Sequence, residues 1–261
     1  MAKVYFTKNL SNSYKTLYQN LETKPRYFDE ADRLAEGIVS NKARYESVAS
    51  LLGVPWYFIA FIHNMESSQN FSTHLHNGDP LSARTKNVPA DRPKKGNAPF
   101  SWEESAEDAL KLRRVKRVKV WSLPRLLYEL EAYNGWGYRL YHAHVASPYL
   151  WSYSQHYSSG KYIADGTWSD TARSRQCGAA VLLKRLEERG DITLAPASLS
   201  TEQFFYSIQK EKGVEALQRF LNQNEGISLR VDGWPGKKTS SAVKALFGCY
   251  LKKDPRDVPE S

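Results

Sequence analysis

One segment, residues 55–66, is apolar over most of its length and ends in a carboxylate. It reads Pro55-Trp-Tyr-Phe-Ile-Ala-Phe-Ile-His-Asn-Met-Glu66. The run predicts a helix, and Pro55 fits its first turn, where a missing N–H costs no hydrogen bond. Because the helix is rich in aliphatic and aromatic side chains, its last turn places Glu66 beside the protein interior.

Glu66 is therefore a candidate general acid. Partial removal from water disfavours the charged form of a carboxyl group and raises its pKa. A carboxylic acid that keeps its proton near neutral pH can donate that proton to a leaving oxygen. The alternative is that Glu66 is an ordinary helix-terminal residue that faces solvent, and its position alone does not separate the two interpretations.

Helical patterns recur through the first 190 residues and predict a mainly α protein. Residues 27–50 contain apolar residues at helical spacing, and a helix at about 43–52 ends at Gly53. Ser101 and Glu104 form a capping-box pattern, and Ser122 caps a helix with Pro124 in its first turn. The helices predicted from these signals span about 101–112 and 122–133, and a further amphipathic helix is predicted over about 170–188. Residues 71–100 are predicted to form a long loop or an irregular hairpin region.

Two helix ends carry motifs. The first is Glu66-Ser-Ser-x-x-Phe71, and the second is Ala132-Tyr-Asn-Gly-x-Gly137. Together they resemble the goose-type lysozymes and soluble lytic transglycosylases, over roughly residues 45–190. The resemblance implies a lysozyme-like helical domain that cleaves the β-1,4 bond between N-acetylmuramic acid and N-acetylglucosamine in peptidoglycan. It also implies that Glu66 is the catalytic acid, that the second motif lines the sugar cleft, and that residues 71–100 form one wall of it.

The same resemblance assigns substrate-binding roles. The first serine of the motif, Ser67, would orient the acid or contact sugar, Tyr133 would bond the acid or pack below the sugar, and Asn134 would hold an acetamido group. Aromatic residues nearby, including Tyr149, Trp151 and Tyr153, offer stacking surfaces, although most aromatic stripes belong to a core. For Tyr133, too, a place in the core is the alternative. The predicted substrate-binding residues are Ser67, Ser68, Tyr133, Asn134, Trp136 and Tyr138.

A second catalytic carboxylate is predicted at Asp79 or Asp91. Asp79 follows Glu66 by thirteen residues, which matches the spacing of the first such carboxylate in goose-type lysozymes. It could activate water across the cleft, but Asn-Gly-Asp-Pro is also a turn sequence. If neither aspartate acts, the resemblance implies a lytic transglycosylase, in which the muramic 6-hydroxyl attacks in place of water.

A zinc-dependent amidase or peptidase is the metal-based alternative. It would use His74, His76 and Asp79 together with His63. The His-x-His pattern is weakly specific, and the sequence contains no HExxH motif. The sequence therefore predicts neither a catalytic metal nor a cofactor.

A second domain is predicted after a boundary within residues 190–200. Residues 215–222 read Glu-Ala-Leu-Gln-Arg-Phe-Leu-Asn, and Val231-Asp-Gly-x-x-Gly-x-x-Thr-x-x-Ala-Val243 follows. This arrangement resembles a small three-helix peptidoglycan-binding module, although Leu246-Phe-Gly248 differs from the usual ending. We therefore expect a catalytic domain over 1–195 and a wall-binding domain over 200–253. The alternative is a helical appendage that only stabilises the enzyme.

Charge favours anionic partners. The net charge is +9, and residues 111–119 hold six basic residues in nine positions. Basic surfaces attract polyanions, which include wall and envelope polymers as well as nucleic acid. Because no nucleic-acid-binding motif accompanies the run, we expect peptidoglycan as partner and no nucleic acid. The competing class is a basic wall-binding or nucleic-acid-binding protein without catalytic activity.

The remaining expectations concern location. No apolar run approaches the roughly 20 residues of a membrane span, and the N-terminus lacks the apolar segment of a secretory signal. The two cysteines suit folding in a reducing compartment. We expect a monomer made in the cytoplasm that reaches the wall by another route, such as holin-dependent release from a phage-infected cell.

Overall fold

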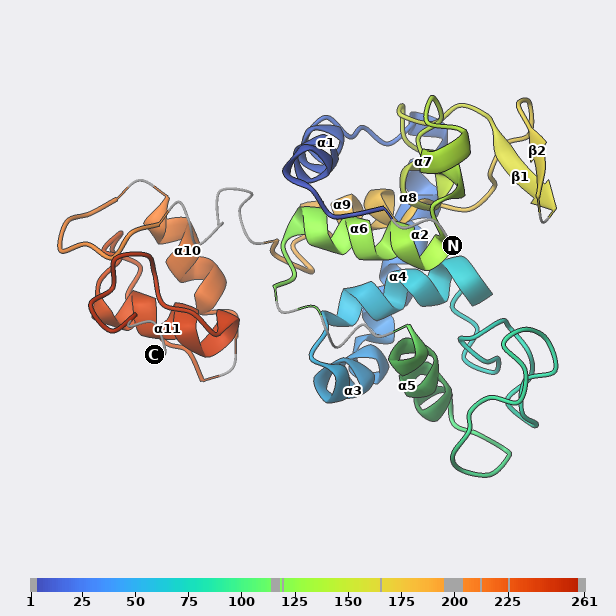
Figure 1. The fold of residues 1–261 in the computed structure, drawn as a ribbon, viewed down its shortest axis with the longest axis horizontal. Coiled ribbons are helices and arrows are strands. Elements are labelled where there is room, and N and C mark those ends of the chain that lie inside the picture. Colours follow the sequence, from blue (N-terminus) through green and yellow to red (C-terminus); the bar gives the residue numbers. More distant parts are fainter. Residues whose placement is uncertain are drawn as a thin grey trace. The chain divides into compact units, whose positions relative to one another are not determined.

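The computed structural model of the chain describes residues 4–113, 118, 120–164, 166–194, 204–211, 213–224 and 226–257. The chain divides into two compact units, Met1–Asp191 and Ile192–Ser261. Eleven α-helices and one two-stranded sheet form within the described residues, so the protein is mainly α, as predicted (Figure 1). Residues 195–203, which include half of the predicted domain boundary, lie outside the described part.

The first unit contains nine of these helices. Their bounds are α1 Lys8–Gln19, α2 Phe28–Ser40, α3 Lys42–Leu52, α4 Trp56–Ser67, α5 Trp102–Leu112, α6 Leu123–Asn134, α7 Gly137–Tyr141, α8 Pro148–Trp151 and α9 Ala179–Glu188, with a 3₁₀ turn at Pro25–Tyr27 before α2. Strands β1 (Lys161–Ala164) and β2 (Thr167–Ser169) pair antiparallel.

Helix α4 is the core helix of the first unit. Every residue from Phe58 to Met65 is buried, as expected for a helix that is apolar on nearly every side. It packs against α3, α6 and α9. Gly53 fixes the turn before it by ending α3 in the left-handed conformation, and Pro55 occupies the N-cap position of α4 without a side-chain capping bond. The helix therefore carries Glu66 out of the core in its last turn.

The predicted capping box at the start of α5 is confirmed. The Ser101 side chain accepts a hydrogen bond from the Glu104 N–H, and the Glu104 carboxylate accepts one from the Ser101 N–H. Helix α6 begins after Ser122 with Pro124 in its first turn, as predicted, although the Ser122 side chain makes no capping bond. Local signals thus place the starts of α5 and α6, and α6 carries the second motif at its C-terminal end.

Residues 71–100 form no helix and contain one isolated antiparallel bridge, between Thr73 and Pro80. Side-chain bonds fasten this loop to α5. His74 Nδ1 lies 2.8 Å from Ser105 Oγ, and His76 Nε2 lies 2.9 Å from Asp108 Oδ2. Arg92 also donates to Asp108, at 2.8 Å. The loop is therefore held as an ordered layer over α5.

The predicted helix over 170–188 is wrong in its first half, because α9 begins only at Ala179. The residues before it form no helical turn, and several of them make hydrogen bonds to distant parts of the chain. The Ala172 carbonyl accepts from the Gly160 N–H at 2.9 Å, and Gln176 Nε2 donates to the Met65 carbonyl at 2.9 Å. At Gly178 the backbone passes so close to α8 that an added Cβ would lie 2.3 Å from the Leu150 oxygen.

The second unit contains two helices within its described residues, α10 (Val214–Leu221) and α11 (Lys237–Phe247). Their apolar faces enclose a small core formed by Phe204, Val214, Leu217, Leu221, Ala242, Val243 and Leu251. The resemblance implied three helices, and no third one forms between residues 204 and 257 where the structure is described. Gly248 ends α11 in the left-handed conformation.

No single helix among the described residues has both the length and the apolar character to cross a membrane. Helices α3 and α4 reach that threshold only when taken as a pair, and the chain bends by 115° between them.

Candidate active site

Glu66 lies where the buried part of α4 gives way to the surface. Its predecessor Met65 is buried, whereas the Glu66 side chain is exposed to solvent. The Tyr149 hydroxyl donates a hydrogen bond to Glu66 Oε1 at 3.2 Å. Surrounding protein raises the pKa of the Glu66 carboxyl above its ordinary range, while the bond from Tyr149 and the charge of Arg113 oppose the rise. Contact with solvent limits the size of this rise.

Two buried phenols lie beside this carboxyl group. Tyr149 comes from α8, and Tyr133 comes from the last turn of α6, in the second motif. Burial, and after it the negative charge of Glu66, raises the pKa of each phenol, and that of Tyr149 most strongly. Both phenols are therefore neutral near pH 7 and can donate hydrogen bonds. The fold thus brings Glu66 of the first motif and Tyr133 of the second into one electrostatic cluster.

Arg113 supplies the positive charge of the cluster. It caps the C-terminal end of α5, and its guanidinium carbon lies 4.7 Å from the centre of the Tyr133 ring. Its charge lowers the pKa of Glu66, Tyr133 and Tyr149 alike. An exposed cation next to a proton donor can also attract an anionic group of a ligand.

Neither serine that follows Glu66 makes a hydrogen bond to its carboxyl group. The Ser67 hydroxyl donates to the His63 carbonyl, one turn earlier, at 3.3 Å. Ser68 is exposed and ends the helix in the left-handed conformation, with φ of 52°. Ser67 is thus the last residue of α4, and Ser68 ends the helix one residue later.

The three remaining residues predicted to bind substrate, Asn134, Trp136 and Tyr138, have different surroundings. Asn134 is exposed at the end of α6. Trp136 packs against Tyr128, with ring centres 4.9 Å apart. Tyr138 is buried and meets the rings of Tyr162 and Trp168, which pair across the hairpin β1–β2. Tyr138 therefore packs α7 on the hairpin, which is the core role considered for such aromatics.

Asp79 organises the loop in which it lies. Its carboxylate accepts bonds from the N–H groups of Lys86 and Asn87, at 2.8 and 2.9 Å, and from the side-chain amides of Asn77 and Asn87. These hydrogen bonds, of which the one from the Asn87 N–H has the largest effect, hold the pKa of Asp79 below its usual range. This geometry is that of the turn interpretation of Asn-Gly-Asp-Pro.

Asp91 is also engaged within the loop. Its carboxylate lies 2.7 Å from Lys94 Nζ and 3.8 Å from Arg84 Nε, and 66% of the side chain is exposed. The bond and charge of Lys94 lower its pKa. No hydrogen bond or ion pair among the described residues links either aspartate to Glu66.

The structure does not gather the four residues of the zinc alternative. His63 bonds to the Tyr45 hydroxyl and the Asn70 carbonyl, and His74 bonds to Ser105 and the Ala83 carbonyl. No group of three or more His, Cys, Asp or Glu side chains within the described residues is placed to hold a metal ion. The histidines therefore hold the loop and the core together.

Sequence reasoning missed two members of the cluster. Tyr149 was considered only as a stacking surface, and its position follows from the four-residue helix α8, which packs on α6 and α9. Arg113 belongs to the basic run 111–119, of which residues 114–117 and 119 lie outside the described part. A Ser-Pro helix start before Tyr149 was the available local signal.

Comparison with known proteins gives no match to a family model, a curated protein or a solved structure.

Proposed function

We propose that the protein is a glycosidase that cleaves the β-1,4 bond between N-acetylmuramic acid and N-acetylglucosamine in peptidoglycan, with Glu66 as general acid. The observation that carries the proposal is the Glu66 cluster. A solvent-accessible carboxyl group with a raised pKa accepts a bond from buried Tyr149 and lies beside Tyr133 of the second motif. These are the properties needed to protonate a leaving glycosidic oxygen.

In the proposed reaction, the Glu66 proton passes to the glycosidic oxygen as the bond from that oxygen to the anomeric carbon breaks. Positive charge then develops at the anomeric carbon, and the carboxylate left behind stabilises it. Tyr149 keeps a hydrogen bond to the carboxylate throughout, which fixes the orientation of the acid. The neutral Tyr133 phenol offers a further donor at the same place.

The second step admits two candidates. In hydrolysis, water adds to the anomeric carbon and returns a proton to Glu66. In transglycosylation, the muramic 6-hydroxyl adds instead, its proton returns to Glu66, and a 1,6-anhydro product forms. The engagement of Asp79 and Asp91 within their own loop favours the second candidate, because neither carboxylate is shown near the acid to activate water.

The same proposal assigns a role to each of the two units. The first unit would be a lysozyme-like catalytic domain and the second a peptidoglycan-binding module that keeps the enzyme on the wall. The basic character of the chain would add attraction to anionic envelope polymers. Release by a phage lysis system remains our proposal for how a cytoplasmic enzyme reaches this substrate.

Purified sacculi test the proposal. After incubation with the full chain, mass spectrometry of the soluble fragments should show disaccharide-peptides. Reducing muramic acid would indicate hydrolysis, and fragments lighter by one water would indicate transglycosylation. Fragments released by cleavage between muramic acid and the peptide, or no fragments at all, would contradict the glycosidase proposal.

Two tyrosine variants, one at the site and one away from it, test whether Tyr149 acts on Glu66. Tyr149→Phe removes the hydrogen bond to Glu66 and should slow fragment release, and the loss of a bond that lowered the pKa of Glu66 should extend activity to higher pH. Tyr18→Phe removes a comparable bond, from Tyr18 to Glu187 at 3.0 Å, away from the site. Equal pH profiles for the two variants would show that Tyr149 does not act on Glu66.

A further inference from the structure

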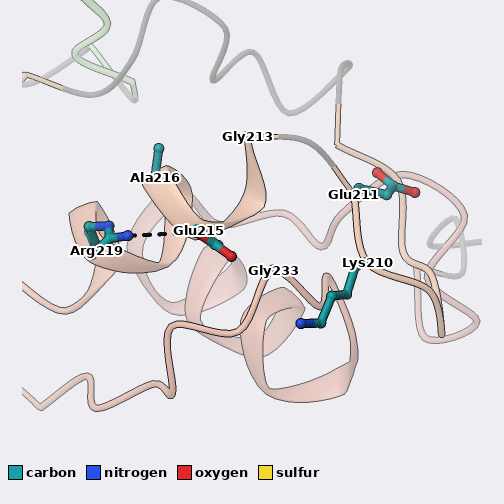
Figure 2. Close-up of a pocket in the computed structure, with 7 residues that line it drawn as sticks. All are labelled: Lys210, Glu211, Gly213, Glu215, Ala216, Arg219 and Gly233. Atoms are coloured by element: carbon teal, nitrogen blue, oxygen red, sulfur yellow. Dashed lines mark ion pairs between the residues drawn. The ribbon is translucent and has the colours of Figure 1, made fainter.

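The second unit has an open hollow beside the start of α10, with a volume of about 520 Å³. The residues that line it are Lys210, Glu211, Gly213, Glu215, Arg219 and Gly233, together with Ala216 (Figure 2). No lining residue is aromatic. Rings that stack on sugar faces, which are common in glycan-binding surfaces, are therefore missing from this hollow.

Two charges of opposite sign face each other across the hollow without forming an ion pair. Figure 2 shows the Lys210 ammonium and the Glu215 carboxylate approaching from opposite sides, with Gly233 between them. Glu215 pairs instead with Arg219, loosely, at 3.6 Å, and both of these side chains are more than half exposed. Lys210 has no ion pair to any described residue. The Glu211 carboxylate lies at the rim and points away.

The wall of the hollow is rigid where Gly233 passes. Gln218, buried in α10, accepts bonds from the N–H groups of Asp232 and Gly233, each at 2.9 Å. Gly233 has φ of 77°, and a Cβ added there would lie 3.4 Å from Glu215 Cγ. The glycine thus keeps space open beside Glu215, and the backbone that passes between the two charges is held in place by Gln218.

We propose that this hollow binds a ligand group that carries an ammonium and a carboxylate together, namely the end of a diaminopimelate residue in a peptidoglycan stem peptide. Glu215 receives the ammonium and Lys210 the carboxylate. The proposal rests on the proposed function, since it takes the bacterial wall as the ligand. The Lys210 ammonium and the Glu215 carboxylate present opposite charges to the hollow, so a zwitterionic group fits better than an anionic polymer.

Two synthetic tripeptides test the proposal on the full chain carrying Glu66→Gln, which prevents cleavage from interfering. One ends in meso-diaminopimelate and the other in lysine, which has the same ammonium but lacks the second carboxylate. Isothermal titration or NMR titration should show tighter binding of the diaminopimelate peptide. The difference should be about fivefold, the size expected for one exposed ion pair of about 1 kcal/mol.

Variants then assign the charges. Lys210→Met should reduce the affinity for the diaminopimelate peptide to that for the lysine peptide and leave the latter unchanged, whereas Glu215→Gln should weaken both. Lys238→Met, which removes an exposed lysine of α11 outside the hollow, is the control and should change neither. Because all three side chains are exposed, the fold should be retained in each variant.

The proposal is overturned if both peptides bind equally, if Lys210→Met behaves like Lys238→Met, or if a peptide-free disaccharide binds as well as the peptides. Its failure is distinguishable from failure of the proposed function. Sacculi cleaved by a chain that ignores both peptides would refute this inference alone. Selective peptide binding by a chain that releases no fragments would support it and refute the glycosidase.

Discussion

Gln218 offers the sharpest test of how the second unit is held together. Its side chain is 1% exposed, and its amide nitrogen donates to Asp232 Oδ1, the Trp234 carbonyl and Thr239 Oγ1. Its amide oxygen accepts from the N–H groups of Asp232 and Gly233. One side chain thus joins α10 to the turn at 232–234 and to the start of α11.

Gln218→Met keeps the volume and removes all five bonds. Two peptide N–H groups, of Asp232 and Gly233, then lack an acceptor, which costs about 1–3 kcal/mol each. Loss of the bonds to the acceptors costs less free energy, because two of these acceptors keep another donor. Asp232 Oδ1 still accepts from the Trp234 N–H, and the Trp234 carbonyl still accepts from the Thr239 hydroxyl. The expected loss is therefore about 4 kcal/mol. A unit of about 70 residues has a total stability of about 4–10 kcal/mol, so much of it should disappear.

Fluorine NMR of 5-fluorotryptophan-labelled protein can measure this loss in the full chain. Trp234 is the only tryptophan after residue 191, so its resonance reports on the second unit alone during urea unfolding. The control is Gln223→Met, at an exposed glutamine two residues beyond the end of α10. If the Trp234 transition occurs at the same urea concentration in both variants, the reasoning about Gln218 is wrong.

Three further predictions concern the first unit and the boundary. Burial lowers the pKa of fully buried His63 to about 4, so the unfolded chain takes up a proton first as the pH falls. The free energy of unfolding of the first unit should therefore drop by roughly 3 kcal/mol between pH 6.5 and 4. The drop should be smaller in His63→Gln, and urea titrations at each pH measure both. Asp79→Ala should lower the melting temperature, while fragment release per folded molecule stays near that of the wild type. A loss of turnover at unchanged melting temperature would instead show that Asp79 is a catalytic base. A chain ending at residue 199 should remain folded and bind sacculi less than the full chain in a pull-down, because two linked sites bind more strongly than one. Equal binding by the two chains would show that the second unit is only structural.

Local signals predicted the helices that carry the site. Pro55 and Gly53 fixed the start of α4, and Ser101 with Glu104 fixed that of α5, because caps and turn residues act within a few positions. The placement of Glu66 in the last turn of an apolar helix followed from the sequence for the same reason. These parts needed no knowledge of distant contacts.

Other features depend on contacts between distant segments. Residues 170–178 have a helical pattern, yet their groups bond to residue 160 and to the end of α4, and Gly178 packs against α8. The hydrogen bond from Tyr149 to Glu66 spans 83 positions and depends on how α8 packs on α6 and α9. Tyr138 faces the hairpin because β1 and β2 form there. Periodicity within one segment contains none of this information.

The central claim is that Glu66 donates the proton, and the rate of fragment release from purified sacculi by Glu66→Gln tests it most directly. The amide keeps the shape of the side chain but cannot give up a proton as the acid does, so release should fall at least about 100-fold while the melting temperature stays close to that of the wild type. Glu46→Gln, at an exposed glutamate of α3, is the control and should release fragments at the wild-type rate. A folded Glu66→Gln that releases them as fast as Glu46→Gln would contradict the account.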